Sequence, residues 1–175
     1  LTRTVANTPA SFSDRTRGVI VGGSDPSATS TSDTITISST GSAVGGFITL
    51  QGNFKEHSGC GNATRGIRFG GGSGTTSVDY STIASGGTQQ DFGTFGGGEQ
   101  GMGAASPTRG LLARGNDGGL QAGVQFITIA STGNAETYGD LTVARYGGGS
   151  ASSTTRAVFA GGWASPLTNT IDYFT

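Results

Sequence analysis

The chain has 175 residues and a mass of 17.4 kDa, which is the size of one ordinary domain. Ten basic and eleven acidic residues give a net charge of -1 without clusters of like charge, so we expect no nucleic acid partner and no binding to an anionic membrane. Gly (34), Thr (26) and Ser (20) dominate the composition, and no apolar run reaches the roughly 20 residues of a membrane helix. We therefore expect neither long helices nor membrane insertion.

A Thr-Arg dipeptide followed by Gly or Ala recurs four times along the chain. Its arginines are Arg17, Arg65, Arg109 and Arg156, at spacings of 48, 44 and 47 residues. A fixed period of this length indicates units that bury their apolar side chains against their neighbours. The units are predicted at about 1–48, 49–94, 95–140 and 141–175, all within a single domain 1–175.

The first predicted element of each unit is a short buried strand that follows the arginine. The strands are expected at 18–23, 66–71, 110–115 and 157–162, and the third is interrupted by Arg114. Three of them end in the pairs Gly22 and Gly23, Gly70 and Gly71, and Gly161 and Gly162. No helix and no Lys-Ser/Thr follows these pairs, so we interpret them as places where strands crowd the axis rather than as phosphate loops.

The second predicted element alternates apolar and hydroxyl residues, which is typical of a half-buried strand. It covers 34–41, 80–87 and 126–133, and it places Ile37, Ile83 and Ile129 exactly one period of 46 residues apart. The Ser, Thr and Gly residues that follow predict a hairpin turn. An aromatic returns at Phe92 and Tyr138, and in the last copy 141–146 is predicted as a third strand.

Three or four short strands in about 46 residues match one blade of a β-propeller. A helical solenoid is excluded by the glycine content, and a β-helix would need a shorter repeat. We therefore predict an all-β propeller of about four repeats, either a segment of a larger propeller or one completed by another subunit. The fourth unit stops before its hairpin turn, so we expect its outer strand to come from more chain or from another subunit.

The repeats resemble the kelch family, in which a glycine doublet is followed by aromatics and by a segment that ends in arginine. The residues that carry the resemblance are the glycine pairs, 171–173 and 141–145. Phe92 and Tyr138 stand where that family has tryptophan, and the first unit has Thr34 where the others have an aromatic. The combination of Thr-Arg-Gly, 129–135, 139–145 and 169–173 is similar to kelch-like proteins of tailed bacteriophages, notably cyanophages. This resemblance implies a virion or tail-fibre component.

Candidate sites are few. The four arginines either form a ring that binds anionic ligands or tie each blade to the next by bonding carbonyls or an acidic neighbour, and we favour the second interpretation. His57 and Cys60 are the only residues of their kinds, which excludes an internal disulfide and a zinc site of Cys and His ligands. Asp25 and 116–119 lack the regular oxygen ligands of a calcium loop, so we expect no metal and no cofactor.

Residues that occur in one copy only are the best candidates for contacts with a partner, because functional differences among repeats lie on loops. The predicted contact residues are Phe54, His57, Met102 and Trp163. A Cys60 and His57 nucleophilic pair is the less favoured alternative to a solvated polar loop. Glu56, Glu99 and Glu136 fall at unlike places in their repeats, which argues against a glycan-cleaving enzyme.

The sequence thus predicts a structural, non-enzymatic virion protein with a role in adhesion to the host surface. Its expected partners are other virion subunits, copies of itself and a glycan of the host cell surface, which would be bound by avidity. The alternative is a secreted, lectin-like propeller that binds glycans without being part of a virion.

Overall fold

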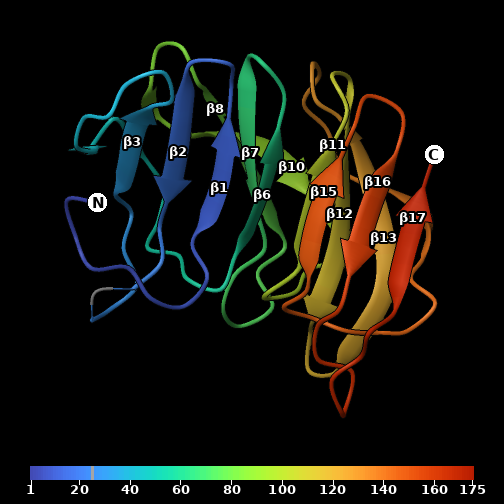
Figure 1. Ribbon diagram of the computed structural model, residues 1–175. Coiled ribbons are helices and arrows are strands. Elements are labelled where there is room, and N and C mark those ends of the chain that lie inside the picture. Colours follow the sequence, from blue (N-terminus) through green and yellow to red (C-terminus); the bar gives the residue numbers. More distant parts are fainter. Residues whose placement is uncertain (25) are drawn as a thin grey trace.

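A computed structural model describes residues 1–24 and 26–175, and these residues form strands, turns and loops without a helix. Four antiparallel sheets are arranged as the blades of a β-propeller, which confirms the predicted fold (Figure 1). The described part of the chain accordingly contains no helix that could cross a bilayer.

Each of the first three blades has four strands, and the fourth blade has three. Blade 1 comprises β1 (Ala10–Ser13), β2 (Arg17–Val21), β3 (Ser32–Thr36) and β4 (Val44–Gly45). Blade 2 comprises β6 (Ser58–Gly61), β7 (Arg65–Phe69), β8 (Ser77–Thr82) and β10 (Gln90–Thr94). Blade 3 comprises β11 (Met102–Ala105), β12 (Arg109–Asn116), β13 (Leu120–Thr128) and β14 (Glu136–Asp140), and blade 4 comprises β15 (Gly149–Ser152), β16 (Ala157–Ala160) and β17 (Ile171–Phe174). A short parallel pair joins β5 (Ile48–Thr49) to β9 (Gly87–Thr88).

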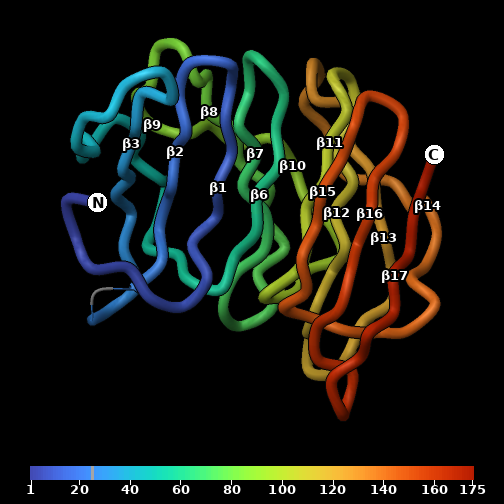
Figure 2. Tube along the Cα trace, in the orientation of Figure 1, coloured from blue at the N-terminus to red at the C-terminus, as the bar shows by residue number. Residues whose placement is uncertain are grey.

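The first strand of each blade is the innermost, and these strands pack on one another in chain order. β1 lies against β6, β6 against β11 and β11 against β15, whereas β15 makes no comparable contact with β1 among the described residues. The chain visits the blades one after another, and its two ends lie on opposite sides of the view (Figures 1 and 2). Among the described residues of one copy, blade 4 therefore does not pack on blade 1 to close a ring.

Small residues let the innermost strands approach closely. A Cβ added to Gly103 on β11 would lie 2.4 Å from the carbonyl oxygen of Gly59 on β6. On the next strand, the hydroxyls of Ser150 and Ser152 donate to the carbonyls of Gly103 and Ala105 at 2.7 and 2.8 Å. Larger side chains on these strands would force the blades apart.

The apolar cores lie between the blades. Because paired residues of a sheet share a face, each blade has a forward face toward the next blade and a backward face toward the preceding one. Three separate buried clusters fill the three boundaries: one contains Phe12, Val19 and Ile83, the next Ile67, Leu112 and Ile129, and the last Leu111, Leu141 and Phe159. Each blade is thus held by its neighbours, as the repeat predicts.

The strand predictions are correct for the second strands of the blades, but the third strands β3, β8 and β13 begin earlier than predicted and end in the first half of the predicted ranges 34–41, 80–87 and 126–133. Two other predictions differ from the structure. Residues 141–146 are not a strand, because the fourth strand of blade 3 is β14 (Glu136–Asp140) and 141–146 is the connection to blade 4. The innermost strands were not predicted. They are rich in Gly, Ser and Ala, and they therefore lack the apolar alternation on which the prediction depends.

Candidate functional site

Each repeated arginine begins or directly precedes the second strand of its blade, after a tight turn. In blade 1 the Asp14 carboxylate accepts the backbone N–H groups of Thr16 and Arg17, both at 2.6 Å, and these bonds, with that of Thr16 first, lower the pKa of Asp14. Asn62 caps the corresponding turn of blade 2 through Thr64 and Arg65, both at 2.9 Å. The turn directs each arginine side chain to the forward face of its blade.

Arg17 and Arg65 connect neighbouring blades. Arg17 Nη1 donates to the carbonyls of Ile83 and Ala84 in blade 2, at 3.2 and 2.9 Å. Arg65 Nη1 donates to the carbonyl of Ile129 in blade 3, at 2.8 Å. Arg65 also lies over the ring of Tyr80, 4.4 Å from its centre. Both guanidiniums are half-buried and bonded to carbonyls, so they are not presented as a ring for anionic ligands.

Arg109 and Arg156 are exposed and donate no hydrogen bond through their guanidiniums within the described residues. Arg109 lies 5.0 Å from the ring centre of Phe126, and Arg156 lies 4.9 Å from that of Tyr173. They stand on the same position of their blades as Arg17 and Arg65. Arg17 and Arg65 differ from them in that their guanidiniums reach the carbonyls of Ile83 and Ile129 in the following blade.

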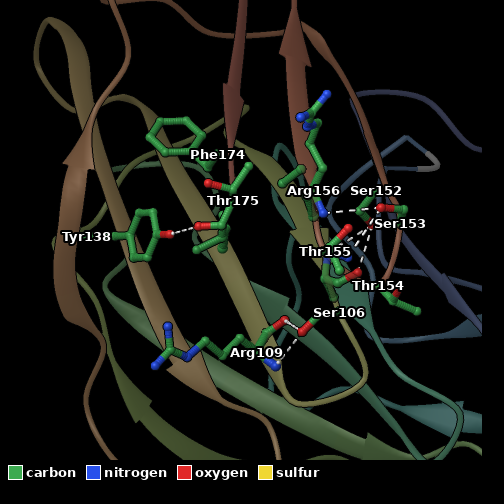
Figure 3. Close-up of a pocket in the computed structure, with 14 residues that line it drawn as sticks. Ser106, Arg109, Tyr138, Ser152, Ser153, Thr154, Thr155, Arg156, Phe174 and Thr175 are labelled. Atoms are coloured by element: carbon green, nitrogen blue, oxygen red, sulfur yellow. Dashed lines mark hydrogen bonds between the residues drawn. The ribbon is translucent and has the colours of Figure 1, made fainter.

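A cavity of about 450 Å³ lies between blades 3 and 4 (Figure 3). Leu111, Tyr138 and Phe174 give it apolar walls, Arg109 lies at its rim, and the Tyr138 hydroxyl donates to the Thr175 carbonyl at 2.6 Å. At the two other boundaries, Ile83 and Ile129 fill the space next to the arginine. The cavity therefore lies beside Arg109, in the place that an isoleucine side chain occupies at the other two boundaries.

Aspartates at one repeat position form buried ion pairs that the sequence prediction missed. Asp33, Asp79 and Asp172 pair with Arg3 (3.1 Å), Arg68 and Arg145 (2.7 Å). Gln125 takes this place in blade 3 and accepts the Gly96 N–H at 2.6 Å. The spacing of these four positions, 46, 46 and 47 residues, is the signal in the sequence that predicts them.

Asp33 and Asp172 stay ionised in their buried positions. For Asp172, burial opposes ionisation, but bonds from Thr142 and Arg145 outweigh it and lower the pKa of the carboxyl. For Asp33, burial is likewise outweighed by bonds from Thr2 and by the charge of Arg3, so its pKa is also lowered. Burial lowers the pKa of Arg68 to about 9, which leaves the guanidinium charged at neutral pH. The Arg68 pair connects two strands of blade 2, and the pairs of Arg3 and Arg145 connect the segments that precede blades 1 and 4 to the third strands of those blades.

His57 and Cys60 lie in the interior, so the prediction of a solvated loop is wrong. His57 is 2% exposed, and its Nε2 lies 3.0 Å from the Val21 carbonyl of blade 1. Burial, with the charge of Arg68 as a second cause, lowers the pKa of His57 to about 3, and burial raises the pKa of Cys60 to about 12. At neutral pH the histidine is uncharged and the thiol is protonated, which is the reverse of an activated nucleophilic pair.

The other predicted contact residues differ in exposure. Met102 is buried in the cluster between blades 3 and 4, so it does not serve as a surface contact. Phe54 is half-buried, stacked on Arg68 with the guanidinium carbon 3.9 Å from the ring centre. Trp163 is 43% exposed on the loop between β16 and β17, where its backbone pairs with Tyr146 and Leu167. Of the four, Trp163 is the residue that the fold presents to solvent.

The glycine pairs lie in left-handed backbone at the end of the second strand. Gly22 and Gly23 have φ of 64° and 90°, and Gly70 and Gly71 have 68° and 137°. A Cβ on Gly70 would lie 2.3 Å from the carbonyl oxygen of Gly98. The pairs therefore permit both a sharp turn and close contact between loops, and these contacts lie at the strand ends rather than at the innermost strands.

A second cavity, of about 480 Å³, is lined by all four innermost strands and by the backward face of blade 1. Its lining is mostly Ser, Gly and Ala, with Ile20 and Ile35 on the side of blade 1.

The described residues include no group of three or more His, Cys, Asp or Glu side chains placed to hold a metal ion. Asp117 pairs with Arg114 at 2.8 Å, and Asp25 lies outside the described residues.

No protein-family profile matches the sequence, and no similar sequence was found among curated proteins.

Proposed function

We propose that the protein is a structural and adhesive component of a tailed-phage particle and that it carries out no catalysis. The observation that supports this best is that the repeated residues make contacts that hold the fold together. Arg17 and Arg65, the buried aspartate pairs and the three cores all hold blade to blade or strand to strand. The residues with the most reactive side chains, His57 and Cys60, are buried and held in unreactive protonation states.

The place on a phage particle is supported by the resemblance of the repeats to kelch-like phage proteins. A surface of Ser, Thr and Gly with a net charge of -1 suits a protein that works outside the cell through many weak contacts. Host adhesion would then depend on how many copies a particle displays rather than on one deep pocket.

The test is whether the chain accompanies phage particles. Antibodies raised against residues 1–175 should label intact virions, and the protein should sediment with them through a density gradient. A protein that stays at the top of the gradient while virions sediment would contradict the proposal.

The second candidate function is a free glycan-binding module, which the exposed indole of Trp163 favours. Aromatic rings stack on sugar faces, and Leu167 beside it is also exposed. Trp163→Ala should then abolish binding to a glycan array while leaving the unfolding transition unchanged. If binding persists in Trp163→Ala but is lost when the chain is monomeric, adhesion depends on avidity and not on this residue.

A further inference from the structure

The large apolar side chains that remain exposed all belong to the first and last units of the described chain. They are Leu1, Ile35, Ile37, Val44, Trp163, Leu167, Ile171 and Tyr173. Blades 2 and 3 expose none, because each of them is covered on both faces by a neighbour. Of these, Ile35 and Ile37 lie on the backward face of blade 1, and Ile171 and Tyr173 lie on the forward face of blade 4. These two outer faces of the row of blades are apolar surfaces without a partner among the described residues.

The backward face of blade 1 is uncovered at positions that are buried in the other blades. Ile37 is 52% exposed, whereas Ile83 and Ile129, one and two periods later, are fully buried against the preceding blade. Leu1 is 65% exposed, whereas Leu141 at the same repeat position is 4% exposed between blades 3 and 4. The backbone N–H of Thr2 donates to Asp33, as that of Thr142 donates to Asp172. The segment around Leu1 therefore has the same conformation-fixing bond as the segment around Leu141.

The forward face of blade 4 is uncovered in the same way. Ile171 is paired with Ala160 and is 66% exposed, whereas Val78 and Val124 at the equivalent position are fully buried. Tyr173 is exposed, whereas its equivalents Tyr80 and Phe126 are half-buried. Arg156 stacks on Tyr173 and donates no hydrogen bond through its guanidinium within the described residues.

The two uncovered faces are complementary halves of one interface that the chain already forms three times. At the first two boundaries an arginine on the forward face donates to the isoleucine carbonyl of the next blade. Arg156 is that arginine on blade 4, and Ile37 is that isoleucine on blade 1. The net charge of -1 gives no repulsion that would oppose association of like chains.

We propose that two copies of this chain associate head to tail, with the forward face of blade 4 in one copy packed on the backward face of blade 1 in the other. A contact between unlike faces closes when its rotation allows, and two such contacts would close a ring of eight blades. Known propellers have about four to eight blades, so a ring of two copies falls within that range. This association does not depend on the proposed function.

The mass in solution tests the association. Sedimentation velocity of the 175-residue chain at micromolar concentrations should give twice the 17.4 kDa of one copy. Ile37→Asp on one face and Ile171→Asp on the other should each raise the dissociation constant by at least about tenfold, since each places a carboxylate in an apolar contact. Both side chains are exposed in one copy, so neither substitution should change the circular dichroism spectrum or the unfolding of the single chain.

Val44→Asp is the matched control. Val44 is 66% exposed in blade 1, but it is paired with Thr34 on the forward side of β3 and lies away from the proposed contact. It should leave the dimer unchanged. A mixture of the Ile37→Asp and Ile171→Asp chains should associate again, because an unaltered blade 1 in one chain meets an unaltered blade 4 in the other.

Three results would overturn the proposal. They are a monomer at these concentrations, a dimer that either substitution leaves intact, and a mixture of the two variants that does not associate. A dimer that only one of the two substitutions disrupts would indicate a contact between like faces instead. Virion labelling can succeed or fail independently of all three, so the outcomes for the proposed function remain distinguishable.

Discussion

The side chain of His57 is an uncharged histidine placed between two blades and next to Arg68. The pKa of His57 is about 3 in the folded chain. Its imidazole therefore binds a proton near pH 6.5 in the unfolded chain but stays unprotonated at that pH in the folded chain. This histidine therefore lowers the free energy of unfolding progressively as the pH falls from about 6.5 toward 3. Asp33 and Asp172, whose pKa values are lowered, add to the loss only below about pH 4.

Replacement of this histidine should flatten the pH dependence. We expect His57→Gln to lose less stability than the unaltered chain between about pH 6.5 and 4.5, since each proton contributes about 1.4 kcal/mol per pH unit. Urea unfolding at both pH values, followed by circular dichroism, measures the difference. Equal losses in the two proteins would mean that the imidazole is accessible and protonated in the folded state.

The arginine contacts between blades predict a second effect at the residue scale. Arg65→Ala should lower the free energy of unfolding by about 2 kcal/mol, because it removes a charged hydrogen bond to a carbonyl and the contact with Tyr80. Arg15→Ala is the control, since Arg15 is exposed two residues before the equivalent arginine of blade 1. If the two variants unfold at the same urea concentration, the Arg65 contact does not stabilise the fold.

Single positions also show what a sequence alone can reveal. The role of Arg17 as a connection between blades followed from its repetition, but the burial of His57 did not. Lys55, Glu56 and His57 look like a polar surface loop, and only the fold places the imidazole under Val21 of the preceding blade. The aspartates at 33, 79 and 172 fall on the repeat period, so their shared role is visible in the sequence.

At the scale of elements, the close packing of the innermost strands gives the sharpest prediction. Gly103→Ala should destabilise the protein by about 1 to 3 kcal/mol, because the new Cβ would meet the backbone of Gly59 at 2.4 Å. Gly119→Ala has open space around the new methyl group and should have an effect near zero. Thermal unfolding of both variants measures the contrast, and similar melting temperatures would show that the innermost strands can move apart.

The strands that the sequence predicts are those with an apolar pattern. β3, β8 and β13 contain apolar side chains such as Ile35, Val78 and Phe126 between polar ones, and those of β8 and β13 pack against neighbouring blades. β1, β6, β11 and β15 pack through backbone and small side chains, so their composition resembles that of the loops around them. Hydrophobic periodicity therefore identifies the middle of each blade and misses its inner edge.

At the scale of the whole molecule, stability should be uneven. Blades 2 and 3 are covered on both faces, whereas blades 1 and 4 each have one uncovered face, and such repeats are stabilised mainly by their neighbours. In the Ile37→Asp chain, where association is removed, backbone amides of β7 and β12 should exchange with deuterium more slowly than those of β2 and β16. Uniform exchange across the four blades, measured by mass spectrometry, would contradict this prediction.

The order of the blades was predictable because each repeat packs on the next one in the chain. The uncovered outer faces were not predictable, since Ile37 and Ile83 have the same local sequence pattern and differ only in what lies opposite. Whether a side chain is buried between units depends on the neighbouring unit. The local sequence pattern therefore does not predict its exposure.

The contacts between consecutive blades also affect how such a protein can evolve. At every boundary an apolar cluster lies between consecutive blades, and each packed innermost strand lies against that of the next blade in the chain. Duplication or loss of one unit of about 46 residues would therefore present the surfaces that its new neighbours already fit. Gene lineages built from this unit can change the number of blades in a single genetic step, and the surface loops can diverge afterwards without disturbing the boundaries.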